Sequence, residues 1–411
     1  MRPLLISPIA RGVAAACAAL ALAATASAQR LKVYVLAGQS NMQGHAKLST
    51  LDYLADDPET AALLSKLRDE HGEPRVIDDV WIAYRTGDGD GEAFGPLTAG
   101  YGARRDVARS DDKLGPELTF GLRVAEAHDG PVLLIKAAWG GRSLHTDFRP
   151  PSAGPFEFSQ QQLDQLKQRG DDIDEARRAK EAATGKDYRQ VVAYVRAVLG
   201  DLPRYCPQYD PQAGYDLAGF VWFQGWNDMV DRGVYPERDR EGGYARYSEC
   251  LAHFIRDMRR DLEAPSLPFV IGVMGVGGEG PDVSASTRNF RAAMAAPAQL
   301  EEFVGNVVAV PTAPYWDAPL AAIAARLDEV REFERKLRNK QKGSQNEDGA
   351  LGEDEQRAAV ARFRAERLTP EDEAVWLRGA SNAGYHYLGC GKTLARIGVA
   401  FADAVLRLEP R

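Results

Sequence analysis

The chain has 411 residues, and its 51 lysines and arginines against 59 aspartates and glutamates give a formal net charge of −8 at pH 7. An acidic balance argues against nucleic acid or an anionic membrane surface as a partner. Hydrophobic residues make up 45% of the chain, enough for a large core in one elaborated domain or one domain with a subdomain. Nothing in the sequence indicates an oligomeric state.

Residues 1–28 have the features of a removable export signal. Arg2 and Arg11 supply the positive start, an alanine-rich apolar stretch follows, and residues 26–28 give a small-x-small cleavage site. A lipoprotein is the alternative for Cys17, but the apolar stretch continues past it. No later segment is apolar for long enough to span a bilayer. We therefore expect residues 29–411 to be exported, to the periplasm or beyond it, with no membrane insertion after cleavage.

Apolar segments alternate with amphipathic ones along the rest of the chain. We expect strands at residues 32–37, 80–84, 132–137, 217–224, 269–276 and 307–310. We expect helices at residues 116–128, 188–199, 244–262 and 392–406. This order is typical of a doubly wound, mostly parallel α/β sheet.

Two insertions interrupt this alternation. Residues 86–113 are rich in glycine and charge and predict a surface loop, in which calcium is disfavoured because an EF-hand glutamate is missing. Residues 318–376 are strongly charged and predict a helical hairpin packed on its own domain, with a coiled-coil partner helix as the alternative. Its apolar residues at helical spacing are Leu320, Ile323, Leu327, Val330 and Leu337.

A candidate nucleophile follows the first predicted strand, in the sequence Gly38-Gln39-Ser40-Asn41-Met42. The glycine lets the backbone turn sharply, so that Ser40 lies at the carboxyl end of the strand, where open α/β sheets bind ligands. A helix N-cap is the alternative for this serine. The block is not the G-x-S-x-G elbow of α/β hydrolases, because Met42 stands where the second glycine is required.

This GQSNM block resembles that of the SGNH/GDSL hydrolases, in particular the sialate O-acetylesterase and acetylxylan esterase branch, which is carbohydrate esterase family six-like. Three further blocks follow in the family's order, at residues 138–144 (AWGGRSL), 222–228 (WFQGWND) and 385–387 (YHY). The resemblance extends from about Leu31 to the C-terminal helix. It implies a flavodoxin-like, three-layer α/β/α fold and a serine carboxylesterase without metal or cofactor.

Among six histidines, His386 is the best candidate for the base. It stands in a loop-like stretch before the last helix, where the resemblance places the histidine that reaches the serine; a capping or packing histidine is the alternative. The family's aspartate, three residues earlier, is replaced by Ala383. We expect Asp228 to orient His386, although it also suits a cap. Asn382 is the second candidate, and a Ser–His dyad is the third possibility.

The oxyanion donors are expected to be Gly141, Asn227 and the Ser40 amide. The glycine lets a backbone N–H approach the substrate, although a tight turn also explains it. Asn227 matches the family's G-x-N-D pattern, and Gln224 is its alternative because it matches the Q-G-E variant, in which Trp226 replaces the glutamate.

Other residues are assigned more briefly. His45 is placed on the helix after Ser40, and His145 is a candidate for substrate binding. No His/Cys/Asp/Glu set has metal-site spacing, and the three cysteines after residue 28 are expected to be buried packing residues. Candidates for a sugar-stacking surface are Trp139, Trp222, Trp226, Tyr315 and Trp316, with the last two favoured and Trp222 expected in the core.

The leading hypothesis is a secreted serine carboxylesterase that removes O-acetyl groups from an acetylated carbohydrate through an acyl-enzyme. A degenerate carbohydrate-binding protein is one alternative, because the expected aspartate is missing. A sugar O-acetyltransferase that uses the same acyl-enzyme is another. The sequence leaves the acetylated sugar open among xylan, pectin, sialylated glycans and other polysaccharides.

Overall fold

The computed structural model describes residues 29–87, 91–103 and 113–409. Within these ranges, seven strands form one sheet in the order β4-β3-β6-β1-β7-β8-β9, in which β4 runs antiparallel to β3 and the other pairs are parallel. The strands are β1 (Leu31–Gly38), β3 (Val80–Arg85), β4 (Glu92–Pro96), β6 (Val132–Ala138), β7 (Tyr215–Phe223), β8 (Phe269–Val273) and β9 (Val307–Pro311). A small second sheet pairs β2 (Ala46–Lys47) with β5 (Lys113–Leu114).

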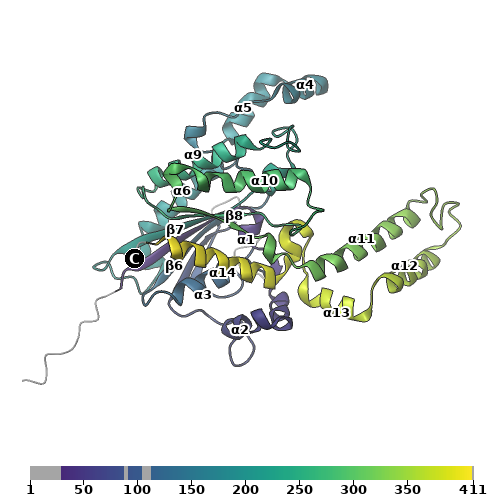
Figure 1. Cartoon of the computed structure of the whole chain (residues 1–411), viewed down its shortest axis with the longest axis horizontal. Coiled ribbons are helices and arrows are strands. Elements are labelled where there is room, and N and C mark those ends of the chain that lie inside the picture. The colour runs from purple at the N-terminus through teal and green to yellow at the C-terminus, as the bar shows by residue number, and fades with distance from the viewer. Residues whose placement is uncertain (1–28, 88–90, 104–112, 410–411) are drawn as a thin grey trace, which may run out of the picture.

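The doubly wound α/β fold is confirmed, with helices on both faces of the sheet (Figure 1). One face is covered by α3 (Glu117–Ala125) and α14 (Gly391–Leu408), whose apolar residues share a core with the strands. The opposite face is covered by α6 (Lys186–Leu199), α9 (Ala245–Asp261) and α10 (Ala285–Ala295). The central strands β1, β6, β7 and β8 are mostly apolar because helices bury both of their faces.

The strand order places a switch point at β1. From β1 the chain builds β3 and β6 on one side and then returns to build β7, β8 and β9 on the other. Crossovers therefore diverge at the carboxyl end of β1, where doubly wound folds bind their ligands. Ser40, the first residue of α1 (Ser40–Gln43), lies at this point.

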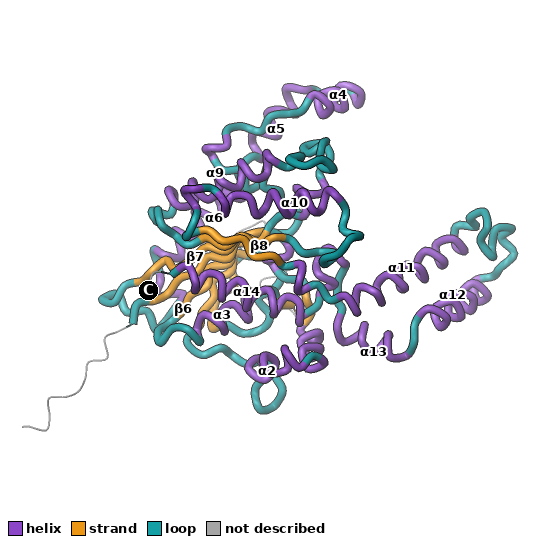
Figure 2. The backbone as a smooth tube through the Cα atoms, viewed as in Figure 1, coloured by secondary structure: helices purple, strands orange, loops and turns teal. Residues whose placement is uncertain are grey.

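The insertion at residues 318–376 extends from the domain as two paired helices (Figure 2). Helix α11 (Ala318–Arg338) and helix α12 (Glu353–Arg367) contact each other, and the rings of Phe333 and Phe363 stack with centroids 4.4 Å apart. All five apolar residues assigned to one face of α11 are buried. Helix α13 (Pro370–Gly379) then returns the chain to the domain.

Some elements were not predicted. Strand β4 lies inside the predicted surface loop at 86–113, of which residues 88–90 and 104–112 fall outside the described residues. The small strands β2 and β5 were not predicted either. The unpredicted helices include α2 (Pro58–Leu67), α4 (Gln160–Arg169), α5 (Ile173–Ala183), α7 (Leu202–Tyr205), α8 (Trp226–Val230) and α10. Short 3₁₀ segments include η1 (Leu48–Asp56), η2 (Pro151–Ala153), η3 (Ala296–Gln299), η4 (Glu301–Phe303), η5 (Ala313–Tyr315) and η6 (Gly384–Gly389).

Two further properties concern the whole described part of the chain. Cys206, Cys250 and Cys390 are buried and free, as expected of packing residues. No helix of the described residues combines the length and hydropathy that a bilayer crossing requires.

Candidate active site

The candidate nucleophile is placed by the turn that ends β1. Gly38 has a φ of +152°, and a Cβ at this position would lie 2.2 Å from the carbonyl oxygen of Phe223 on β7. Only glycine fits such a close approach between neighbouring backbones. Ser40 then opens α1 with 6% of its surface exposed. Its backbone N–H has no acceptor among the described residues, as is usual for the first turn of a helix.

Gln39 fixes the orientation of the Asn227 side chain. The Oε1 atom of Gln39 accepts the backbone N–H of Gly225 at 3.0 Å, so the amide nitrogen of Gln39 must face the other way. That nitrogen donates to Oδ1 of Asn227 at 3.3 Å. The Nδ2 donor of Asn227 is thereby turned away from Gln39, and it makes no hydrogen bond to another described residue. Asn227 therefore presents an amide donor at the carboxyl edge of the sheet.

Gln224 occupies a different position from its neighbour Asn227. It is buried, and its Nε2 atom donates to Gln39, to the backbone carbonyl of Arg142 and to Asp228, at 3.1, 3.0 and 2.6 Å. These internal acceptors use both amide hydrogens. Of the two amides considered as oxyanion donors, Asn227 alone keeps its Nδ2 group free of partners within the described chain.

The glycine pair after β6 approaches the candidate nucleophile. A Cβ on Gly140 would lie 3.6 Å from the Cβ atom of Ser40, and the Gly140 N–H donates to Oε1 of Gln43 at 3.1 Å. Gly141 has a φ of +76°, a left-handed conformation that favours glycine, and no atom lies within 4 Å of its added Cβ. The Gly140 amide is thus held by Gln43, and Gly141 faces open space.

A buried ion pair supports the short helix that carries Ser40. Lys136 on β6 and Glu117 on α3 are both fully buried, with 2.8 Å between Nζ and Oε2. The same Nζ donates to the carbonyl oxygen of Gln43 at 2.8 Å. A buried charge is tolerated when it is paired and hydrogen-bonded. This arrangement ties the end of α1 to the centre of the sheet.

His386 lies on η6, which contacts α1, and its partner is Asn382. The Nδ1 atom of His386 is 3.0 Å from Oδ1 of Asn382, and the same oxygen accepts the backbone N–H of Ala383 at 2.8 Å. Since that backbone group can only donate, the atom facing the ring is the amide oxygen. Nδ1 must therefore carry the ring hydrogen, which leaves Nε2 unprotonated.

The imidazole of His386 is enclosed by two other rings. The ring of His45 stacks on it with centroids 4.0 Å apart and planes 4° from parallel, and Tyr385 contacts it edge-to-face at 4.5 Å. Burial lowers the pKa of His386 to about 4, with a further contribution from Lys113. Burial and the neighbouring His386 lower the pKa of His45 to about 3. Both rings are therefore neutral at ordinary pH.

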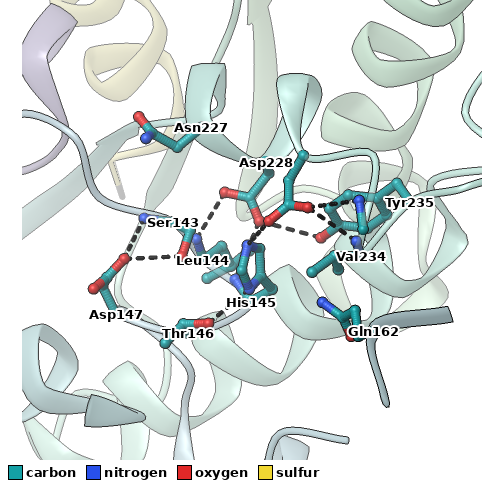
Figure 3. A network of polar contacts seen from close by, with 12 residues as sticks. Ser143, Leu144, His145, Thr146, Asp147, Gln162, Asn227, Asp228, Val234 and Tyr235 are labelled. Carbon is teal, nitrogen blue, oxygen red and sulfur yellow. Dashed lines mark hydrogen bonds and ion pairs between the residues drawn. The ribbon is translucent and has the colours of Figure 1, made fainter. Parts of the chain in front are cut away.

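The expectation that Asp228 orients His386 is wrong for this structure. Asp228 is fully buried and accepts four hydrogen bonds. Figure 3 shows it beside Leu144, His145 and Tyr235. Its donors are the backbone N–H groups of Leu144 and His145, at 2.8 and 3.1 Å, the amide of Gln224 and the hydroxyl of Tyr235, at 3.1 Å. Asp228 therefore fastens the loop after β6 to α8, and Asn382 takes the position beside the histidine.

The other candidate side chains are also placed. His45 lies just before β2 and not on the helix after Ser40. The ring nitrogens of His145 contact Thr146 at 2.7 Å and Asp231 at 3.2 Å, so this ring is engaged within the protein (Figure 3). Trp222 is buried in the core as expected, and Trp139 is nearly buried as well.

Sequence reasoning did not identify Gln39, Gln43, His45 and Tyr385 as parts of the site. Gln39 and Gln43 flank Ser40 closely, and polar side chains so near a buried serine were an available signal. Tyr385 is the neighbour of His386 in the sequence and contacts its ring. His45 is more than 300 residues away in the sequence, and no spacing rule predicts its contact with His386. Within the described ranges, no group of three His, Cys, Asp or Glu side chains is arranged to hold a metal.

The chain matches a protein family described as carbohydrate esterase, sialic acid-specific acetylesterase, over residues 30–313. The protein thus belongs to this family of carboxylic ester hydrolases. The matched residues include Ser40, Gly141 and Asn227, whereas Asn382 and His386 lie beyond them.

No protein in the curated set matches the chain. Among solved structures, similarity is found to a protein from Arabidopsis thaliana, at 17% identity and a TM-score of 0.36, over 68% of this chain and 85% of that one. A carbohydrate acetylesterase from Xanthomonas citri is 14% identical with a TM-score of 0.37, over 68% of this chain and 49% of that one. NanS is 16% identical with a TM-score of 0.38, over 70% and 78%. The family assignment rests on the sequence match, not on these structures.

Proposed function

We propose that this protein removes O-acetyl groups from carbohydrates through an acyl-enzyme formed on Ser40. The observation that carries the proposal is the geometry of His386, whose Nδ1 is held by an acceptor oxygen and whose Nε2 is left as a base. This base belongs to a segment that contacts the helix of the buried Ser40. The family of the chain supplies the ester class.

In the proposed reaction, Nε2 of His386 takes the hydroxyl proton as Ser40 Oγ attacks the acetyl carbonyl carbon. The Asn227 amide, the Ser40 N–H and the Gly141 N–H donate to the oxygen that becomes negative. The bond from carbon to the sugar oxygen then breaks, and the imidazolium returns its proton to that oxygen. Water repeats the sequence on the acetyl-serine and releases acetate, with the serine hydroxyl restored.

The neutral partner of His386 has a chemical cost in this scheme. An amide oxygen fixes the ring tautomer but does not neutralise the imidazolium, and Lys113 opposes that charge further. A base whose pKa lies far below neutrality accepts a proton less readily than one near the working pH. We therefore expect the enzyme to turn over slowly and to stay active in acid.

We also propose that the protein is exported, because residues 1–28 have the features of an export signal.

The test is acetate release from 9-O-acetylated sialic acid, acetylated xylan and acetylated pectin. We expect the wild type to act on at least one of them and Ser40→Ala to lose about 10³-fold or more in kcat. A fluorophosphonate probe should label Ser40. Ser65→Ala, on exposed α2, is the matched control and should keep full activity. Acetate release that persists in Ser40→Ala would refute the acyl-enzyme, and sugar binding without release would favour a binding protein.

A further inference from the structure

We propose that Tyr385 and Trp226 form a stacking platform for the sugar ring that carries the acetyl group. This proposal rests on the function proposed above and adds the residues that select a carbohydrate alcohol over other alcohols. It assigns a pyranose ring, bound through its C–H face, as the group that the platform recognises.

The two side chains come from distant segments and meet beside the site. Trp226 is the first residue of α8 and Tyr385 belongs to η6, and their ring centroids lie 5.6 Å apart with planes at 39°. Trp226 is half-buried and Tyr385 is 45% exposed. Phe94 and Tyr385 are the aromatic residues among the exposed large hydrophobic side chains of the described residues. Of these two, Tyr385 contacts His386.

Each ring adjoins a residue with a role in the proposed reaction. Trp226 directly precedes Asn227, which presents the oxyanion donor, and Tyr385 directly precedes His386 and contacts its ring. The leaving sugar oxygen must come within hydrogen-bond reach of His386 Nε2 to receive its proton. We place the ring attached to that oxygen on the side of His386 that Tyr385 contacts.

The other aromatic candidates are placed less favourably. Trp139 and Trp222 are buried, so no ligand reaches their faces. Tyr315 packs towards α14, where the Arg396 guanidinium lies 5.3 Å from its ring centre. Trp316 packs against Tyr387, with centroids 6.2 Å apart. We therefore propose Trp226 and Tyr385 as the platform in preference to Tyr315 and Trp316, which stay the candidates predicted from the sequence.

The backbone of η6 is shaped to present Tyr385 outward. Tyr387 and Leu388 have φ values of 52° and 60°, a left-handed conformation that is unfavourable for side chains of this size. The segment is held by the buried Tyr387 hydroxyl, which accepts the Gly275 N–H at 2.7 Å and contacts Thr312 Oγ1 at 2.6 Å. Backbone strain of this kind persists where the surrounding structure holds it in place, and it clusters at functional sites. The strained turn buries Tyr387 and leaves Tyr385 on the surface.

The experiment compares two esters with the same acyl group, ethyl acetate and a monoacetylated methyl xylopyranoside. We expect Tyr385→Ala to lower kcat/KM for the sugar ester about 10-fold more than for ethyl acetate, mainly through KM. Tyr385→Phe should restore the ratio, because the stacking face is kept. Phe94→Ala removes an exposed aromatic of strand β4 and should leave both esters unaffected.

A second readout avoids catalysis of the sugar ester. Deacetylated methyl xylopyranoside should inhibit ethyl acetate hydrolysis, and Tyr385→Ala should raise its inhibition constant about 10-fold. Equal losses on both esters, with an unchanged inhibition constant, would overturn the platform and leave the esterase proposal intact. A wild type that cleaves neither of these esters nor any of the acetylated carbohydrates named under the proposed function would overturn that function itself.

Discussion

The imidazole of His386 meets an amide oxygen where serine hydrolases commonly hold a carboxylate. In the serine protease template, replacing that aspartate by asparagine costs about 10⁴-fold in kcat because the wrong tautomer results. Here the backbone N–H of Ala383 occupies the same Asn382 oxygen and keeps it pointing at the ring. Ala383 stands where the resemblance leads us to expect an aspartate. Its backbone N–H fixes the orientation of the Asn382 amide, which an asparagine side chain alone would not fix.

Restoring a carboxylate at this position should change the pH profile in a defined direction. A negative charge beside His386 favours the imidazolium, so Asn382→Asp should raise its pKa from about 4 by about 1–3 units. Because the reaction needs the neutral ring, the acid limb of kcat/KM should move to higher pH by the same amount. Activity at pH 5 should fall relative to the wild type, while activity at pH 8 should hold or rise. A limb that stays near pH 4 would show that Asn382 does not face the base.

Removal of the amide provides the companion measurement. Asn382→Ala leaves Nδ1 without an acceptor, so the wrong tautomer becomes populated, and kcat should fall about 10²–10⁴-fold. The free energy of unfolding should change little, because Asn382 is partly exposed. Undiminished turnover in this variant would assign the site to a Ser–His dyad.

Asp228 should behave in the opposite way. Asp228→Asn places an NH₂ group among four donors in a fully buried position, so it should destabilise the fold by about 3–5 kcal/mol. Chemical denaturation measures this loss directly. If Asp228→Asn instead keeps wild-type stability and loses only kcat, the carboxylate would have a role in the reaction that its contacts do not indicate.

The sequence alone does not decide whether Asn382 or Asp228 is the partner of His386. Ser40, Asn227 and His386 stand in recognisable blocks, and the strand ends that carry the first two were predictable from apolar runs. The donors to Asp228 come from residues 144, 145, 224 and 235, which meet only after β6 and β7 flank β1. A buried carboxylate saturated by distant donors looks the same in a sequence as one that faces a histidine.

The segment η6 shows how one element sets several functional positions. The buried hydroxyl of Tyr387 anchors the segment, while Tyr385 is exposed and contacts the ring of His386. Tyr387→Phe removes the acceptor of the buried Gly275 N–H, which should destabilise the fold by about 1–3 kcal/mol. Tyr385→Phe is the matched control for denaturation and should have no effect on stability, since its ring is 45% exposed. Equal stability of the two variants would contradict the anchoring role of the Tyr387 hydroxyl.

Element prediction succeeded where burial leaves a pattern. The six predicted strands are apolar because helices cover both faces of the sheet, and the four predicted helices all bury a stripe of apolar residues. Helix α5 buries none of its residues and α4 buries only Leu166, so neither leaves a periodic apolar signal. Strand β4 is half exposed at the sheet edge and contains a glycine and a proline, which read as a loop.

At the scale of the whole molecule, the helical hairpin is the largest departure from a compact domain (Figure 1). Its base packs on the domain through Leu320, Tyr53 and Leu388, while α12 contacts chiefly α11. The buried Asn346 closes the tip by bonding the carbonyl of Leu337 and the N–H of Leu351. The tip therefore forms a local structure of its own.

Shortening the tip should leave the chemistry in place. Deletion of residues 342–349, closed with two glycines, removes contacts that are local to the hairpin, so kcat/KM for ethyl acetate should stay within about twofold of the wild type. Thermal unfolding of the remainder serves as the control for folding. A collapse of activity in a folded variant would show that the hairpin shapes the site from a distance.

The three buried thiols can be used to measure local opening of the structure around them. Burial raises the pKa of Cys206 to about 11 and of Cys250 to about 12, and it raises the pKa of Cys390 as well. A thiol reagent therefore reacts only with molecules in which the surrounding structure has parted. Cys390 immediately follows η6, so its alkylation rate measures how often the segment that carries His386 opens. Cys250 lies in α9, so its alkylation rate measures opening of the helical layer on the opposite face of the sheet. A single native-state labelling experiment thus separates motion near the reacting groups from loss of the fold.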